Sequence, residues 1–134
     1  MADGVTEMRL VVTTPDYVEA LAFYRDVLGL PLLAAFDDGA GHVTILDAGR
    51  ATLELSDVPH AEHIDQVEVG RRVAGHIRVA FEVSDSAAAT ARLVAGGATL
   101  IAPPRPTPWR SLNSRLDAPG GLQLTLFQNL EAEF

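Results

Sequence analysis

The chain repeats one plan twice, and this repetition constrains its fold more than any other feature of the sequence. In the first half an apolar strand-like run, 8–14, is followed by a helical stretch that ends at Gly29 and later by the alternating run 51–56. In the second half the same order leads from 76–83, through an Ala-rich helical stretch, to the alternating run 122–127. A duplicated unit predicts two similar modules that face each other with a cleft between them.

Capping and turn residues divide each half into one helix and four strands. Asp16 is placed to cap the first helix and Gly29 to end it, and Asp85 is a cap candidate for the second. The remaining strands are expected at 32–36, 42–47, 98–102 and 111–116. The predicted fold is α+β, a single domain over 1–134 with one βαβββ module at about 7–57 and a second at about 75–128.

Two segments are expected to lie outside the regular elements. The polar stretch 58–74 is too long for a tight turn and is expected to be a connector between the modules. Its two histidines, His60 and His63, have a metal-like spacing but no third ligand nearby, so we expect exposed loop side chains. The segment 103–108 contains four prolines and cannot be a central strand.

The composition excludes several classes of function. The chain has no cysteine, which excludes disulfides, a thiolate nucleophile and a Cys-ligated metal. Its net charge of −8 argues against nucleic acid and anionic membranes as partners. Because there is no signal peptide and no apolar run of membrane-spanning length, we expect a cytoplasmic protein.

Alternate residues of a strand face opposite sides, so the expected sheet has one apolar and one polar face. Leucines and valines such as Leu53 and Leu55 should pack under the helices. The opposite face should line the cleft if the sheet curls, and its members are Arg9, Glu54, His76, Arg78, Glu82, Gln123 and Thr125.

Three stretches carry a resemblance to a known family. They are the helix motif FYRDVLGL at 23–30, the strand GHIRVAFEV at 75–83 and the closing stretch 117–127, in which the usual D-P-D-G turn reads D-A-P-G. With these motifs the chain, from about residue 8 to 127, resembles the vicinal oxygen chelate superfamily, which includes glyoxalase I, extradiol dioxygenases, fosfomycin-resistance transferases and bleomycin resistance proteins. The resemblance implies two βαβββ modules in a curled mixed sheet around a pocket, and most often a homodimer.

The resemblance also implies four positions that hold a divalent metal in the metal-dependent members. By motif these positions fall on Arg9, Glu54, His76 and Thr125. A guanidinium has no lone pair to donate and a threonine offers only a neutral hydroxyl, so two ligands remain where three are typical. We therefore expect no cofactor; the alternative is a depleted divalent metal site held by Glu54 and His76. The two modules should superpose with Arg9 near the place of His76 and Glu54 near that of Thr125.

Two positions allow more than one interpretation. Arg9 and Glu54 form either a strut across the cleft or part of a ligand site. Trp109 either plugs the edge of the core or forms a stacking wall at the pocket mouth.

Two hypotheses about function follow. The first is a metal-independent protein of the bleomycin-resistance kind, which binds a small aromatic or anionic molecule through Arg9, Glu54, His76, Arg78, Trp109 and Thr125. The second is a lyase or dioxygenase of the glyoxalase type, with His76 and Glu54 as catalytic residues in a depleted metal or acid–base site. Either protein is expected to be a homodimer, because the sheet edges of such modules are otherwise exposed.

Overall fold

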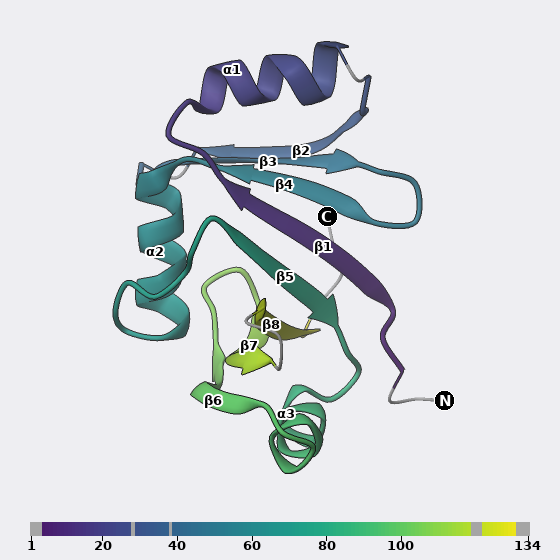
Figure 1. Ribbon diagram of the computed structural model, residues 1–134, viewed down its shortest axis with the longest axis vertical. Coiled ribbons are helices and arrows are strands. Elements are labelled where there is room, and N and C mark those ends of the chain that lie inside the picture. Colours follow the sequence, from purple (N-terminus) through teal and green to yellow (C-terminus); the bar gives the residue numbers. More distant parts are fainter. Residues whose placement is uncertain (1–3, 28, 38, 119–121, 131–134) are drawn as a thin grey trace.

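The structure is a computed structural model that describes residues 4–27, 29–37, 39–118 and 122–130. Two similar runs of elements follow each other along the chain (Figure 1). The first contains β1 (Glu7–Thr13), α1 (Tyr17–Leu21) continued by the π-helical segment η1 (Ala22–Val27), β2 (Leu32–Asp37), β3 (His42–Asp47) and β4 (Thr52–Ser56). After α2 (Val58–Glu68) come β5 (Ile77–Glu82), α3 (Ser86–Ala95), β6 (Thr99–Pro106), β7 (Ser111–Ala118) and β8 (Leu122–Asn129).

All strands belong to one curled, eight-stranded mixed sheet in the order β2-β3-β4-β1-β5-β8-β7-β6. β1 pairs in parallel with β4, and β5 pairs in parallel with β8 in the same way. The antiparallel pair of β1 and β5 joins the two halves. The predicted α+β fold is confirmed. Among the described residues no helix is long and apolar enough to cross a membrane.

The strand register defines which residues of the two modules are equivalent. Asp16 caps α1 and Asp85 caps α3, and Val11 precedes Asp16 by five residues as Ala80 precedes Asp85, so Val11 and Ala80 are equivalent. Val11 lies opposite Glu54 and Ala80 opposite Thr125, which makes Glu54 and Thr125 equivalent, as predicted. Arg9 precedes Val11 by two residues and Arg78 precedes Ala80 by two, so Arg78 occupies the place equivalent to Arg9. The prediction that His76 occupies this place is wrong by two residues, a slip that leaves the face of the strand unchanged.

The two faces of the sheet separate apolar from polar side chains as the alternation predicts. Leu53 and Leu55 pack with Leu46 in a cluster that α1 covers. A second cluster, built around Leu116 and Leu126, packs against α3. Leu55 and Leu116 are completely buried, and burial of each contributes about 1.5–3 kcal/mol. Glu54 and its alternate neighbours are left to the opposite, concave face.

The connector was expected to have no regular structure, and here the sequence-based expectation is wrong. Its first part is the helix α2, capped by Asp57, whose carboxylate accepts a hydrogen bond from the amide of His60 at 2.9 Å. Gly41, at a φ of +154°, allows the β2–β3 turn to approach, since a Cβ there would overlap the amide of His60. His60 is buried, so it is not the exposed loop histidine that was expected, and His63 is only partly exposed.

The proline-rich segment also differs from the expectation. The strand expected at 98–102 continues to Pro106 as part of β6. β6 lies at the edge of the sheet and pairs with β7 alone, through a register that shifts twice. An edge strand tolerates proline because one of its sides needs no amide donors, so the exclusion of a central strand holds.

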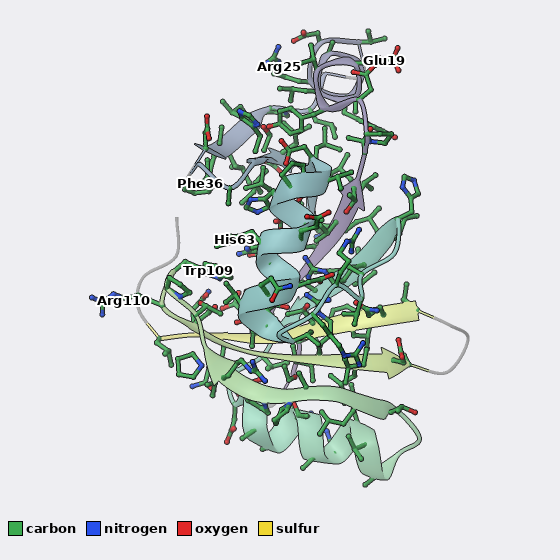
Figure 2. The ribbon with its side chains drawn as sticks, turned by 90° about the vertical axis from the view of Figure 1, so that its left-hand side faces the viewer. Glu19, Arg25, Phe36, His63, Trp109 and Arg110 are labelled. Carbon is green, nitrogen blue, oxygen red and sulfur yellow. The ribbon has the colours of Figure 1, made fainter. Side chains whose placement is uncertain are left out.

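A buried ionic network fastens α2 to the second module. The guanidinium of Arg115 on β7 is fully buried, and it donates to Asp65 Oδ1 at 2.8 Å and to Glu68 Oε1 at 2.7 Å. Asp65 also accepts from the amides of Val73 and Ala74, each at 2.8 Å. The network fastens α2 to β7 of the second module, and the helix also contacts β3 of the first module. Figure 2 shows α2 in front of the strands.

Removal of this cation should destabilise the protein strongly. Arg115→Met leaves Asp65 and Glu68 buried and without their shared partner, and we expect a loss of about 3–5 kcal/mol in the free energy of unfolding. Urea unfolding at neutral pH measures it. Arg71→Met, at an exposed arginine after α2, is the matched control and should change the free energy by less than about 0.5 kcal/mol. A loss near that of the control would show that the network does not stabilise α2.

Candidate functional site

A cavity of about 510 Å³ is lined by the concave face of the sheet together with α2 and the β6–β7 turn. Its volume lies within the range of small-molecule sites. The apolar lining consists of Val11, Phe36, Val43, Ile45, Ile64, Ala80 and Phe127. The polar lining consists of Arg9, Glu54, His60, Glu68, Arg78, Trp109, Arg110, Ser111, Asn113, Thr125 and Asn129. An apolar wall with a few convergent charged groups is typical of a ligand site.

Most of the residues predicted to line the cleft meet in this cavity, but His76 does not. Arg9, Glu54, Arg78 and Thr125 lie on its floor, and Trp109 lies in its lining. His76 is exposed before the start of β5, where its Nδ1 lies 2.8 Å from the carbonyl oxygen of Thr13. The expectation that His76 and Glu54 share one site is therefore wrong, because the concave side of β5 begins at Arg78.

Two further residues expected in the cleft lie outside the lining. Glu82 accepts a hydrogen bond from Asn129 at 3.3 Å, and Gln123 accepts one from Arg115 at 2.7 Å. Both lie on the predicted face of the sheet, but beyond the part that the cavity occupies.

Arg9 is held by several neighbours at once. Its Nε lies 2.5 Å from Glu7 Oε2, and its Nη1 lies 3.8 Å from Glu54 Oε2. The guanidinium also stacks 4.5 Å above the centre of the Phe127 ring. The expected pair of Arg9 with Glu54 forms, with Glu7 as an additional partner, but it joins the adjacent strands β1 and β4 of the first module and does not span the cleft.

Arg78 is the less heavily paired of the two floor cations. Its Nη1 donates to Thr125 Oγ1 at 2.8 Å, and Thr125 Oγ1 donates in turn to Glu68 Oε1 at 3.1 Å. Within the described ranges this is the only hydrogen bond of the Arg78 side chain, and no carboxylate forms an ion pair with it. Burial lowers the pKa of Arg78, although the nearby charges of Glu68 and Glu54 partly oppose this effect.

Glu54 is the one acid among the four pseudo-equivalent floor residues. Burial raises the pKa of its carboxyl, while Arg9 and Arg78 lower it and Glu68 raises it further. Its side chain is 16% exposed, so the carboxyl is reachable from the cavity. A carboxyl with a raised pKa can act as a proton donor or acceptor.

Aromatic side chains form the mouth of the cavity. Phe36 on β2 is 48% exposed and Trp109 in the β6–β7 turn is 44% exposed. Figure 2 shows Phe36, His63, Trp109 and Arg110 along the same side of the molecule. The geometry therefore favours the interpretation of Trp109 as a wall at the mouth over that of a core plug. Arg110, which follows it, has a left-handed φ of +67°, an uncommon conformation for a residue with a side chain.

The floor residues do not fit a divalent metal ion. Once the register replaces His76 by Arg78, the four family positions hold two guanidiniums, one carboxylate and one hydroxyl. Two permanent cations repel a metal ion, and one carboxylate does not supply the usual number of ligands. Throughout the described part of the chain, no group of three or more His, Asp or Glu side chains is arranged to hold a metal.

Several residues that shape the site were not singled out from the sequence. Along β7, Asn113 and Arg115 share one face while Leu112 and Leu116 share the other, so the parity argument applied to the other strands would have placed the two polar residues on the concave face. Asp65 and Glu68 lie on α2, and the sequence signal for the start of this helix is the capping residue Asp57 followed by Pro59. Asn113 donates to Glu68 at 2.7 Å and completes the buried network.

The raised pKa of Glu54 predicts a specific pH dependence of stability. A folded-state pKa above the ordinary value of 4.5 means that the contribution of this group to stability is fully present below about pH 4.5, and that it is lost as the pH rises through the folded pKa. We therefore expect Glu54→Gln to become progressively more stable relative to the wild type as the pH rises above about 4.5. Melting temperatures of both proteins measure it, with the exposed Glu62→Gln as control. A difference independent of pH would contradict the assignment.

Comparisons with known proteins support the family resemblance and the fold. The sequence model of the Glyoxalase/Bleomycin resistance protein/Dioxygenase superfamily matches residues 8–126. No curated protein sequence matches this chain.

Solved structures show the same fold at low sequence identity. A hypothetical protein from Bacillus halodurans is 16% identical, with a TM-score of 0.71 over 100% of this chain and 99% of that one. The methylmalonyl-CoA epimerase of Mycobacterium tuberculosis is 20% identical, with a TM-score of 0.68 over 98% and 93%. A variant of 4-hydroxymandelate synthase from Streptomyces coelicolor is 22% identical, with a TM-score of 0.65 over 97% of this chain but 39% of that one. From the match of the family model over most of its length, the chain belongs to the Glyoxalase/Bleomycin resistance protein/Dioxygenase superfamily.

Proposed function

We propose that this protein binds a small anionic or aromatic molecule in the cavity, without a resident metal. The observation that carries the proposal is the position of Arg78, a partly buried guanidinium on the cavity floor whose side chain hydrogen-bonds only to Thr125 among the described residues. A partly buried cation without an ion-pair partner binds an anion more strongly than an exposed one, since folding has already removed part of its water.

The rest of the lining supports a ligand with an apolar body. Val11, Val43, Ile45 and Ala80 surround the charged floor with hydrocarbon, and Phe36 and Trp109 add aromatic surface at the mouth. The cavity volume suits one small organic molecule. A hydrocarbon wall around one cation favours a ligand that combines a charged group with an apolar part.

Metal independence is proposed from the chemistry of the floor. The two arginines carry positive charge at the places where metal-dependent relatives are expected to carry ligands. The arginines of this floor would bind the negative group of a ligand directly, whereas in a metal-dependent relative the metal ion would bind it.

A second candidate function is acid–base catalysis by Glu54. The raised pKa of its carboxyl, inside a cavity that also holds Arg78, favours proton transfer to or from a bound anion. Methylmalonyl-CoA epimerase and 4-hydroxymandelate synthase, both similar in fold, are enzymes by name. A lyase or oxidoreductase activity would then depend on Glu54 without His76, which lies outside the cavity.

We also propose that the protein is a cytoplasmic homodimer. The edge strands β2 and β6 expose leucines, among them Leu32, Leu33 and Leu100. Sheet edges with exposed leucines are stabilised when a second copy covers them. Sedimentation equilibrium tests this proposal, and a monomer at high micromolar concentration would contradict it.

The binding proposal predicts ligand stabilisation that survives chelation. Chelator-treated protein is screened by thermal shift against small aromatic and anionic compounds, and at about 100 times the dissociation constant a ligand adds about 2.7 kcal/mol to the free energy of unfolding. Divalent metal ions added alone should leave the melting temperature unchanged. Ala80→Leu, which places a larger side chain on the cavity floor, should abolish the ligand effect.

Two results would contradict the proposal. One is that no compound of either class stabilises the protein. The other is a large stabilisation by one divalent ion that is lost in Glu54→Gln, which would reveal a metal site.

A further inference from the structure

We propose that the cavity selects a planar aromatic molecule with a single carboxylate, held with the carboxylate on Arg78 and the ring toward Phe36 and Trp109. This inference rests on the proposed function and specifies the ligand class of the same site. It follows from three features of the cavity: the contacts of its two arginines, the balance of its charges and the distribution of its aromatic side chains.

The contacts distinguish Arg78 from Arg9 as the group that holds the anion. Arg9 already lies against Glu7 at 2.5 Å and Glu54 at 3.8 Å, and its face is covered by Phe127. The Nε and Nη2 atoms of Arg78 have no hydrogen bond to any described residue, because its contact with Thr125 uses Nη1. That edge of a guanidinium presents two parallel N–H groups, which match the two oxygens of a carboxylate.

The placement of the charges favours a ligand with no more than one negative charge. Arg115 and Arg72 neutralise Asp65 and Glu68 in the buried network. Arg9 forms ion pairs with Glu7 and Glu54, so these carboxylates equal in number their arginine partners together with Arg78, and Arg78 is the one floor cation without an ion pair in the described part of the chain. Glu54 and Glu68 also line the cavity. A second anionic group on the ligand would meet these two carboxylates, and close like charges cost binding energy.

The aromatic side chains favour a planar body between the floor and the mouth. Val11, Val43 and Ala80 contribute apolar surface to the cavity lining, and the half-exposed rings of Phe36 and Trp109 line the same cavity. A planar ring that extends from Arg78 gains offset or edge-to-face contacts with these aromatics, which a saturated ring of the same size does not.

Four probes of similar size test the ligand class by isothermal titration in the presence of chelator. They are 2-naphthoate, its neutral amide 2-naphthamide, the dianion 2,6-naphthalenedicarboxylate and the saturated analogue decahydro-2-naphthoate. We expect 2-naphthoate to bind best, with each of the other three weaker by about tenfold or more, which corresponds to about 1.4 kcal/mol.

Variants test the assignment of the residues. Arg78→Met should lower the affinity for 2-naphthoate by more than about tenfold. Arg78→Lys should recover part of the loss, because it restores the positive charge but not the two parallel N–H groups of the guanidinium. Arg71→Met, at an exposed arginine outside the cavity, is the matched control and should leave the affinity unchanged. Trp109→Leu at the exposed mouth should reduce the preference for 2-naphthoate over its saturated analogue. A thermal melt confirms that each variant is folded, and Trp109→Leu keeps the test valid if Arg78→Met does not fold.

The outcomes separate this inference from the proposed function. If the amide or the dicarboxylate binds as tightly as 2-naphthoate, or if folded Arg78→Met keeps full affinity, the inference is wrong, while binding that Ala80→Leu abolishes still supports the proposed function. Binding of 2-naphthoate that Ala80→Leu leaves intact places the ligand outside the cavity and overturns the inference. If none of the four probes binds but another anionic or aromatic compound binds in the cavity, only the inference fails.

Discussion

The position of α2 depends on the neutralisation of one fully buried arginine. Arg115 has no exposed surface, and its guanidinium cannot lose its charge. The segment that packs over it on the concave face must therefore supply carboxylates. Asp65 and Glu68 supply them from α2, and Arg72 with the amides of Val73 and Ala74 satisfies the rest of Asp65. Burial opposes the ionisation of Asp65, but these hydrogen bonds outweigh it and lower the pKa of the carboxyl. The network turns a polar connector into one wall of a cavity.

The same concave face determines what the cavity can hold. The sheet is built from two equivalent modules, so each floor residue of one module has a counterpart in the other. Arg9 corresponds to Arg78 and Glu54 to Thr125, according to the register of the central strands. Relatives that use a metal would place ligand atoms at such positions, whereas here two permanent cations stand beside one carboxyl. The family fold is retained, and anion binding at Arg78 is our proposal for its central site.

The duplicated plan of the sequence predicted the fold, and residue alternation predicted most of the floor, because alternation depends only on the geometry of a strand. Leu53 and Leu55 pack under α1 and Glu54 faces the cavity, as their positions in the sequence indicate. The prediction that His76 lies in the cavity was wrong because a motif match locates the start of a strand only to within a few residues. Strand alternation did not reveal the error, since a shift of two residues along a strand leaves the side chain on the same face of the sheet. α2 was missed because its inward side carries His60, Asp65 and Glu68, so apolar periodicity does not reveal it. Long-range pairs such as Arg115 with Glu68 have no local signal, since 47 residues separate them.

We propose that the cavity floor attracts an anion and not a metal ion. Anomalous diffraction from crystals soaked with bromide and Zn²⁺ at equal concentration tests this proposal most directly, because each ion is located separately at its own absorption edge. We predict a bromide peak beside Arg78 and no zinc peak at Glu54. A zinc peak coordinated by Glu54, with no bromide in the cavity, would contradict it.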